Sequence, residues 1–389
     1  MSGTHNKKIL FLTLVHPDFL PPVYAIGQVL RDEGYEVHIL TFDSYVPSEF
    51  DLGAGIVVES VGKHHGVGLA ERLKLRRKYT KRAKQLVDEK PLAIIAGCPF
   101  TFLCALKIKG RTPLVYHAIE VADFIAALFL KSPISHFNNL LALKRVHKAD
   151  MVATVSVQRS AWLAGRCHLE FMPYSILNTA YLPAKPADRD YDTFKKIVPA
   201  DFLDKKIVLY TGAVNSHLCT MELVKAFDLV HDEGSALVVT GIKDNAYCNE
   251  IKAFVENCRS KDRIKLLPYV TRTEMLALQA NSDIGVCLAK EYDDNVESKM
   301  MAPNKVGEYL AKGLYLLGIR NEYLMQFKMK GIASLSASPE PEDIGVAIKE
   351  ALVAVDNKEY KDVIKAFVVD YFCMQQQAKP IVNFLKRIQ

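Results

Sequence analysis

The sequence lacks the features of a secreted, membrane-spanning or zinc-stapled protein. No apolar run approaches the roughly 18 residues that a membrane-spanning helix needs, and the most apolar stretch, residues 124–130, ends at Lys131. The eight cysteines are scattered without a CxxC pair, which excludes a zinc ribbon and a thioredoxin motif. No secretory cleavage pattern precedes the first apolar run. We therefore expect a cytoplasmic protein with reduced cysteines.

Several nucleotide-binding and catalytic signatures are also missing. HPDFLPP follows the first apolar run, where a dinucleotide-binding domain needs GxGxxG. The chain has neither a GxxxxGK[ST] loop nor a GxSxG nucleophile elbow. The acid-rich string 188–192 has the DxD spacing that can hold a metal and a diphosphate, but a solvated loop is the favoured interpretation there. We expect the protein to bind no metal and no cofactor, only its substrates.

The composition is that of a globular protein of about two domains. The chain has 389 residues, of which 50% are hydrophobic and 24% charged, so a disordered or fibrous chain is excluded. Strand-like apolar runs alternate with segments of helical periodicity, which predicts parallel sheets covered by helices on both faces. The expected strands are 8–15, 35–42, 56–61, 92–96, 114–117, 151–155, 206–211, 236–240, 263–267, 284–288 and 314–318.

The alternation breaks once, in the polar segment 178–205, which contains three prolines. We interpret this segment as a linker between two similar α/β halves. The predicted domains are residues 1–180, residues 181–365 and a C-terminal helix over 366–389 that returns to the first domain. The predicted fold class is α/β, with two Rossmann-like doubly wound parallel-sheet domains facing across a cleft, where open α/β sheets bind ligands.

The positive charge is concentrated in one segment. The net charge is +6, but residues 63–90 alone hold ten Lys or Arg against three acids. Leu69, Leu73, Tyr79, Ala83 and Leu86 follow helical spacing within it, which predicts a basic amphipathic helix. Two interpretations stay open: a solvated surface helix, or a surface over 69–90 that docks on anionic lipid headgroups. We expect no nucleic-acid binding, because no recognised motif accompanies the charge.

The most informative segment is MMAPNKVGEYLAKG, residues 300–313, which opens a predicted helix in the second half. Pro303 precedes the helix and Asn304 can cap it, whereas Lys305 lies in the first turn, where a cation opposes the helix dipole. An anion bound at this helix end would explain the lysine. Glu308, one turn on, could accept hydrogen bonds from ribose hydroxyls. The alternative is an ordinary capped helix with a surface Lys and Glu.

PNKVGEYLAKG resembles the donor-site helix of the family 4 (group 1) glycosyltransferases of GT-B fold, particularly the bacterial branch written PNKxxEYxAxG. Further motifs are similar to this family in the same order along nearly the whole chain. They are KKILFLTLV at 7–15, PLVYHAIE at 113–120, KRVHKADMVATVS at 144–156, FMPYSILN at 171–178, KIVLYTGAVN at 206–215, LPYV at 267–270 and VDYFCMQQQAKPIVNFL at 369–385.

The resemblance implies a hexosyl or N-acetylhexosaminyl transfer from a nucleotide sugar, most simply a uridine diphosphate sugar, to a hydroxyl acceptor. It implies retention of configuration and no bound metal. The second domain would bind the donor and the first a carbohydrate or lipid-linked acceptor. A lipid-linked acceptor would place the protein at the inner membrane face and account for the concentrated positive charge. The implied donor-binding residues are Gly212, Ala213, Asn215, Tyr269, Val270, Pro303, Asn304, Lys305 and Glu308. The implied catalytic residues are His117, Glu120 and Lys305, and His16 and Pro17 lie on the acceptor side.

The sequence departs from the family pattern at two places. The first of the family's paired carboxylates, eight residues before Glu308, is replaced by Met300, and Glu297 could substitute only if the loop slips. The usual Arg and Lys after Gly212 are also missing, which leaves neutralisation of the diphosphate to Lys305. Two alternatives therefore stay open: a non-catalytic subunit, and a non-hydrolysing nucleotide-sugar epimerase. For His117, a core histidine at the end of a strand is an interpretation of equal weight to a functional one.

Overall fold

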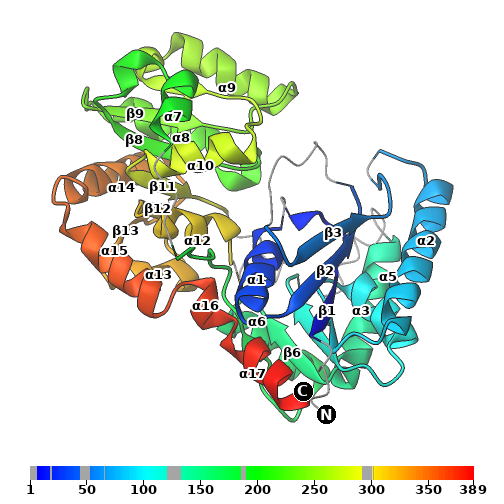
Figure 1. Cartoon of the computed structure of the whole chain (residues 1–389). Helices are drawn as coiled ribbons and strands as arrows, with labels where there is room; N and C mark the ends of the chain where they lie inside the picture. The colour runs from blue at the N-terminus through cyan, green and yellow to red at the C-terminus, as the bar shows by residue number, and fades with distance from the viewer. Residues whose placement is uncertain are drawn as a thin grey trace. The chain divides into compact units, whose positions relative to one another are not determined.

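The computed structural model describes residues 7–17, 20–43, 53–64, 66–120, 133–184, 190–290, 300 and 302–389. They form two compact units. Unit 1 comprises the described residues of Met1–Tyr181, Asp293–Ala302 and Met374–Gln389, and unit 2 those of Leu182–Tyr292 and Pro303–Cys373. Figure 1 shows the chain coloured along its sequence.

Unit 1 is built on a parallel sheet. Its strands and helices are β1 (Lys8–Leu12), α1 (Pro21–Asp32), β2 (Glu36–Thr41), β3 (Ile56–Ser60), α2 (Leu69–Asp88), β4 (Ala93–Ala96), α3 (Pro99–Ile108), β5 (Leu114–Ala118), α5 (Pro133–Arg145), β6 (Met151–Thr154), α6 (Val157–Cys167), β7 (Tyr174–Ser175), α16 (Met374–Gln377) and α17 (Lys379–Ile388). In the described residues the strand order is β3-β2-β1-β4-β5-β6-β7. The order reverses between β1 and β4, and ligands of open α/β sheets bind beyond the carboxyl ends of strands at such a point.

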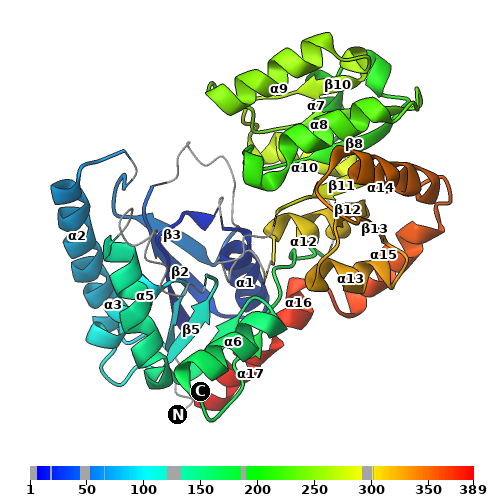
Figure 2. The same ribbon diagram turned by 180° about the vertical axis from the view of Figure 1, so that it is seen from behind.

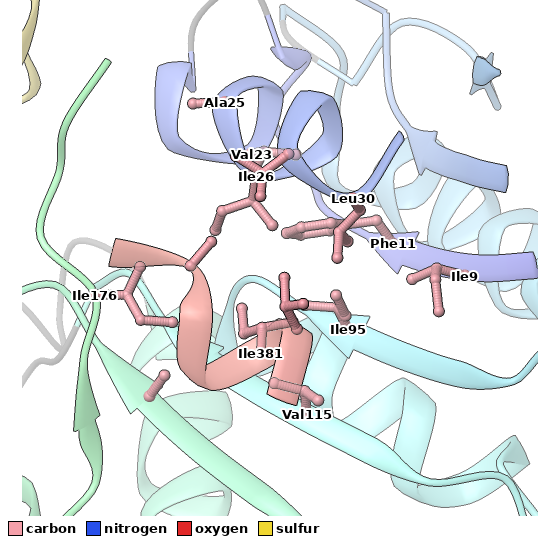
Figure 3. Packing of buried hydrophobic residues seen from close by; sticks show 14 of the residues in the cluster. Ile9, Phe11, Val23, Ala25, Ile26, Leu30, Ile95, Val115, Ile176 and Ile381 are labelled. Atoms are coloured by element: carbon pink, nitrogen blue, oxygen red, sulfur yellow. The ribbon is translucent and has the colours of Figure 1, made fainter. Parts of the chain in front are cut away.

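Both faces of the unit 1 sheet are covered. On one face α1 packs Val23 and Ile26 into a cluster with Phe11, as Figure 3 shows. On the other face Tyr79 of α2 and Phe102 of α3 belong to a second cluster with strand residues. Because both faces of the central strands are covered, β1, β4 and β5 are continuous buried runs rather than alternating ones.

The end of the chain belongs to unit 1. Ile381 of α17 packs in the same cluster as Ile95 and Val115 of the sheet (Figure 3), and Met374 of α16 is part of it as well. Helix α15 (Glu359–Asp370), which precedes them, belongs to unit 2. The C-terminal helices therefore tie the last residues of the chain into the core of the first unit.

Unit 2 repeats the same architecture. Its elements are α7 (Tyr191–Ile197), β8 (Lys206–Tyr210), α8 (Thr220–Leu229), β9 (Ser235–Val239), α9 (Ala246–Asn257), β10 (Ile264–Leu266), α10 (Arg272–Ala280), β11 (Ile284–Cys287), α12 (Asn304–Ala311), β12 (Tyr315–Ile319), α13 (Glu322–Lys328), β13 (Ala333–Ser336), α14 (Pro341–Ala354) and α15. The described strands are parallel in the order β10-β9-β8-β11-β12-β13. Figure 2 shows α8 and α14 side by side. The strand order reverses between β8 and β11, which places the candidate ligand edge there.

The basic helix forms where the sequence predicts it, but with a different buried stripe. Leu69 and Leu73 are 60% and 43% exposed, whereas Leu75 is buried with Tyr79 and Ala83. Leu75 lies one helical turn before Tyr79 on the same face, and Leu73 does not. Among the described helices, none combines the length and the hydropathy that crossing a bilayer requires.

The linker segment 178–205 contains a helix, α7, that its polar composition does not predict. Asp190 is the N-cap of α7 and its side chain accepts a hydrogen bond from Thr193 N–H, while Asp192 forms an ion pair with Lys195 at 2.8 Å. These two acids begin and stabilise a helix, and Asp188 lies outside the described residues. No cluster of three or more metal-binding side chains occurs in the part of the chain that the structure describes.

Candidate functional site

The N-terminus of α12 lies at the carboxyl edge of the unit 2 sheet. Its N-cap is Pro303, and Asn304 is the first helical residue. The prediction that the Asn304 side chain caps the helix is wrong, because no side chain caps it and Val306 N–H donates to the Pro303 carbonyl oxygen at 3.2 Å. Asn304 Oδ1 is buried without a hydrogen-bond partner among the described residues. A helix start with no side-chain acceptor of its own is suited to an anion.

Lys305 places a buried ammonium at this helix start. Its Nζ atom lies 4.1 Å from the centroid of the Tyr210 ring and has no hydrogen-bond partner in the described part of the chain. A Cβ atom on Gly212 would lie 3.8 Å from Nζ, so the ammonium faces the turn that follows β8. Burial lowers the pKa of Lys305, but the net shift of this pKa is upward, because Tyr210, Tyr309 and Cys287 act together in the opposite direction. The group stays charged, and a buried charge is costly until an opposite charge meets it.

Tyr309 fixes α12 against the end of β8. Its hydroxyl accepts a hydrogen bond from Thr211 N–H at 3.0 Å and pairs with Thr211 Oγ1 at 2.9 Å. Burial raises the pKa of Tyr309 to about 12, so the phenol is neutral near pH 7. A Cβ atom on Gly285 would lie 2.4 Å from the Tyr309 ring. Glycine at 285 is therefore what lets the tyrosine, and with it the helix start, approach the sheet.

The turn after β8 exposes backbone where the sequence predicts a donor-binding loop. Gly212 has φ +115° and Gly241 has φ +90°, and a Cβ atom on Gly241 would lie 2.0 Å from the Gly212 carbonyl oxygen. The Ala213 carbonyl oxygen accepts a hydrogen bond from the Tyr210 hydroxyl at 2.5 Å. The Asn215 side chain accepts one from Leu218 N–H at 3.0 Å and caps a short turn. Gly212 and Ala213 are exposed, whereas Asn215 Oδ1 already accepts the hydrogen bond from Leu218 N–H within the turn.

Glu308 is held inside a polar network. Its side chain is 9% exposed, and Oε1 lies 2.6 Å from Nη2 of Arg272. Its Oε2 accepts a hydrogen bond from Gln279 Nε2 at 3.2 Å. A carboxylate oxygen has two lone pairs, so each oxygen can accept a second donor such as a ribose hydroxyl. The structure thus adds two protein partners to the residue that the sequence assigns to the ribose.

Arg272 is a site residue that the sequence analysis missed. It is the first helical residue of α10, after the Thr271 N-cap. A cation in a first helical turn opposes the helix dipole, which is the same signal that singles out Lys305. Gln279, by contrast, is a buried amide in the last turn of α10, and no sequence pattern marks it.

Lys290 is a second cation that the sequence analysis missed. Its backbone N–H donates to the His217 carbonyl oxygen at 2.9 Å, and its Nζ contacts Glu222 Oε1 at 2.6 Å. The hydrogen bond to Glu222 raises the pKa of Lys290. The turn that begins at Gly212 therefore has a lysine bonded to it through the backbone, although it carries no Arg or Lys itself.

Tyr269 and Val270 lie in the loop after β10. Gly241 N–H donates to the Pro268 carbonyl oxygen at 3.1 Å, which places this loop beside the turn after β9. Tyr269 is 56% exposed. The loop leads directly into Arg272, so the residues assigned to the base and the Glu308 network share one short segment.

In unit 1, His117 is enclosed in the core. It is 0% exposed, and neither ring nitrogen has a hydrogen-bond partner among the described residues. Burial lowers the pKa of His117 to about 4, so the imidazole is neutral near pH 7. This environment favours the interpretation as a core histidine over a catalytic one.

Glu120, at the end of the same strand, is exposed. The carbonyl oxygen of the preceding Ile119 accepts a hydrogen bond from Arg159 Nη1 at 2.6 Å, and Arg159 Nε donates to the Met300 carbonyl oxygen at 3.0 Å. Met300 thus contributes backbone where the family pattern has a carboxylate, and Glu297 lies outside the described residues.

The predicted acceptor-side loop follows β1. His16 is half-buried and Pro17 is buried, with the Pro17 carbonyl oxygen accepting a hydrogen bond from Leu20 N–H at 3.0 Å. Both residues lie at the carboxyl edge of the unit 1 sheet, beside the reversal of strand order. Their role at an acceptor site stays a prediction.

No known family model matches the sequence, and no curated protein matches it. Solved structures do match. A glycosyltransferase from Rickettsia africae ESF-5 is 13% identical with a TM-score of 0.68, over 99% of this chain and 99% of its own. Anabaena Alr3699/HepE in complex with UDP-glucose is 15% identical with a TM-score of 0.68, over 98% and 99%. A Listeria monocytogenes protein assigned as a UDP-N-acetylglucosamine 2-epimerase is 14% identical with a TM-score of 0.64, over 98% and 96%.

Identities this low establish the fold alone. The chain has two α/β units with parallel sheets, the fold of GT-B glycosyltransferases. The predicted fold class, α/β with two Rossmann-like parallel-sheet domains, is confirmed. Membership of family 4 and of its PNKxxEYxAxG branch stays a prediction.

Proposed function

We propose that the chain is a glycosyltransferase that moves a hexosyl or N-acetylhexosaminyl group from a uridine diphosphate sugar to a hydroxyl acceptor. One observation carries the proposal. The Lys305 ammonium is buried at the start of α12 against the Gly212 turn, with no hydrogen-bond acceptor among the described residues. A diphosphate supplies the negative charge that this arrangement lacks. The likeness to the Anabaena protein in complex with UDP-glucose supports the choice of uridine.

The donor-binding roles follow from the contacts in unit 2. The first N–H groups of α12 and the Lys305 ammonium bind the diphosphate, whose other side approaches the exposed backbone of Gly212 and Ala213. Glu308 accepts hydrogen bonds from the ribose, while Arg272 and Gln279 hold its carboxylate in place. Tyr269 and Val270 contact the base.

The costly step is departure of the nucleoside diphosphate. The bond between the sugar C1 and the phosphate oxygen breaks, its electron pair stays on the diphosphate, and the acceptor oxygen bonds to C1. For retention in this single step the acceptor attacks from the side that the diphosphate leaves, so its hydroxyl proton passes to a phosphate oxygen of the leaving group, and Glu120 is the candidate residue that orients the hydroxyl. Lys305 and the helix start stabilise the charge that builds on the leaving group, and such preorganised donors can be the largest catalytic contribution. We infer retention of configuration and metal independence from the family resemblance only.

We further propose that unit 1 binds the acceptor, a carbohydrate or a lipid-linked sugar, and that the exposed cations of α2 face an anionic membrane surface. These cations include Lys74, Arg77, Lys81 and Lys84. Each basic residue near an anionic surface contributes about 1 kcal/mol. The protein would then act at the cytoplasmic face of the membrane.

The donor site is tested by replacing Lys305 with methionine and titrating the full-length protein with UDP in a calorimeter. We expect UDP affinity to fall roughly tenfold to a hundredfold, the range of a hydrogen bond to a charged group. The matched control is Lys330→Met, because the Lys330 ammonium also lies over an aromatic ring, that of Phe367, at 4.8 Å. This control should bind UDP as the wild type does.

Unchanged UDP affinity in Lys305→Met would reject the donor site. Glu308→Ala provides the second arm of the same titration. It should weaken UDP more than 2′-deoxy-UDP, because only the ribonucleotide has the 2′-hydroxyl that the carboxylate would accept. Melting curves of each variant exclude loss of the fold as the cause.

Two other functions remain as alternatives, each favoured by one observation. Met300 in place of a carboxylate favours a non-catalytic subunit, and the structural likeness to an epimerase favours a nucleotide-sugar epimerase. Purified chain alone, given UDP-N-acetylglucosamine and an acceptor extract, separates them. Release of UDP with a glycosylated product supports the transferase, an epimerised donor supports the epimerase, and an unchanged donor supports the subunit.

A further inference from the structure

One arginine of α2 behaves differently from the other cations of that helix. The Arg76 Cζ atom lies 4.8 Å from the centroid of the Phe100 ring, and its Nε is buried without a hydrogen-bond partner among the described residues. Burial lowers the pKa of Arg76. Arg82, two turns later, instead forms an ion pair with Glu59 at 2.5 Å. Arg76 is thus drawn inward and left without a carboxylate in the described part of unit 1.

The position of Arg76 in the fold is that of a ligand site. Helix α3 follows β4, so its first turn lies at the carboxyl edge of the sheet, where open α/β sheets bind ligands. Phe100 lies in the first turn of α3, which begins after the N-cap Cys98. The start of α3 adds a second positive field of the same sign at this edge.

The start of α3 lies beside the end of β5. Strands β4 and β5 are hydrogen-bonded neighbours, and a Cβ atom on Gly97 would lie 3.5 Å from Cδ1 of Ile119. Phe100, which Arg76 covers, follows β4, and Glu120 follows β5. Arg76 and Glu120 therefore lie at the same edge of unit 1.

Packing alone does not account for an arginine here. Contact with an aromatic ring contributes about 0.5–2 kcal/mol, whereas a half-buried charge without a counter-charge is destabilising. An apolar side chain would cover Phe100 without that penalty. The planar guanidinium keeps donors that match the oxygens of a phosphate or a carboxylate. A ligand that brings an oxyanion would supply the missing counter-charge.

We propose that Arg76 binds a phosphate group carried by the acceptor at the carboxyl edge of unit 1, beside Glu120. That the phosphate belongs to an acceptor rests on the proposed transferase function, but the phosphate site itself does not. Two sources share this chemistry: a soluble sugar phosphate, and the phosphate of a membrane lipid that carries the acceptor. Glu120 would then meet the neutral hydroxyl that receives the sugar.

The test is protection of Arg76 from phenylglyoxal, an arginine-selective reagent, in the full-length protein saturated with UDP. Modification at each arginine is followed by mass spectrometry with and without inorganic phosphate. At a phosphate concentration near ten times its Kd, we expect modification of Arg76 to slow about tenfold. The exposed Arg77 and Arg111, which lies at the opposite edge of the sheet before β5, should show no slowing in the same samples.

Two further probes identify the source of the phosphate. Glucose 6-phosphate represents the soluble source, and vesicles of phosphatidic acid in phosphatidylcholine represent the lipid source. Stronger protection of Arg76 by either one, relative to glucose or to pure phosphatidylcholine, supports the proposal and selects that source. Protection by neither probe nor by inorganic phosphate, or equal slowing at Arg76, Arg77 and Arg111, overturns it.

A pair of variants gives a second readout should the reagent not reach Arg76. With UDP blocking unit 2, the wild type and Arg111→Met should bind radiolabelled phosphate alike, and Arg76→Met should lose about tenfold in affinity. Equal binding by the two variants rejects the site. UDP affinity, measured in parallel, should be unchanged in Arg76→Met. If the wild type does not bind UDP, the donor proposal is rejected, while the phosphate measurement still tests the Arg76 site independently.

Discussion

The carboxyl edges of the two sheets use charge in different ways. In unit 2 the Glu308 carboxylate is gripped by Arg272 and Gln279 before any ligand arrives. In unit 1 the guanidinium of Arg76 has no carboxylate beside it among the described residues, and Glu120 is exposed. The same architecture therefore carries a carboxylate held by two protein partners in unit 2 and an exposed carboxylate in unit 1, and each edge also has a cation without a counter-charge among the described residues, Lys305 and Arg76. We infer that unit 2 holds its carboxylate in place before a ligand binds, whereas both edges depend on a ligand for the charge balance of their cation.

The two edges also differ in how closely their backbones approach. A Cβ atom on Gly241 in unit 2 would lie 2.0 Å from the Gly212 carbonyl oxygen, and Gly241 has φ +90°. A Cβ atom on Gly97, at the end of β4 in unit 1, would meet its nearest neighbours at 3.5 Å. Only the unit 2 edge is packed so tightly that a methyl group has no room.

The largest expected effect is therefore that of Gly241→Ala. It should destabilise unit 2 by about 3 kcal/mol or more, because the methyl group overlaps backbone and the residue must keep a positive φ. Gly97→Ala, the matched change in unit 1, should cost no more than about 1 kcal/mol. Differential scanning calorimetry measures both. Equal losses in the two variants would contradict the difference in packing.

His117 gives the next largest effect, and it concerns pH. Its pKa is lowered by burial to about 4, against about 6.5 in the unfolded chain. Between these values the unfolded state binds more protons, so stability is present above about pH 6.5 and is lost as the pH falls towards 4. The loss should reach about 3 kcal/mol at pH 4.

Urea unfolding of the wild type and of His117→Gln, from pH 7.5 to 4, isolates this contribution. The variant should lose less stability over the range, because glutamine does not titrate. His217 of unit 2 also has a pKa lowered by burial, but its side chain is only half-buried, so His217→Gln should flatten the profile less. A profile of His117→Gln that parallels the wild type would show that His117 is protonated in the folded state.

Site residues could be predicted from the sequence where the interaction that marks them is local, and not where it joins segments far apart in the chain. Lys305 could be found because its conflict with the helix dipole is local to four residues, and Arg272 carries the same signal. Gly241 could not be assigned, since its need for glycine comes from the Gly212 carbonyl oxygen across the sheet edge. Arg76 looked like one more cation of a basic helix until Phe100 was placed against it.

Some errors at the level of elements have the same cause. Asn304 has the right residue type for a cap, but it is the first helical residue of α12, and the N-cap position is one residue earlier, at Pro303. Leu73 follows Leu69 at helical spacing, but Leu75 lies one turn before Tyr79, and Leu75 is the leucine that is buried. The fold class was predictable, because continuous apolar strands alternating with helices leave few arrangements.

The smallest expected effect concerns the outer face of α2, where Arg77 and Lys81 are exposed one turn apart. Because each cation near an anionic surface contributes about 1 kcal/mol, Arg77→Ala with Lys81→Ala should weaken binding to phosphatidylglycerol vesicles roughly thirtyfold. The control is Lys349→Ala with Lys365→Ala, which removes the same charge from exposed positions of unit 2. Flotation of the full-length protein measures both. If the control lowers binding as much, the attraction comes from net charge rather than from α2, and Arg76 would then be the only cation of this helix with an assigned ligand.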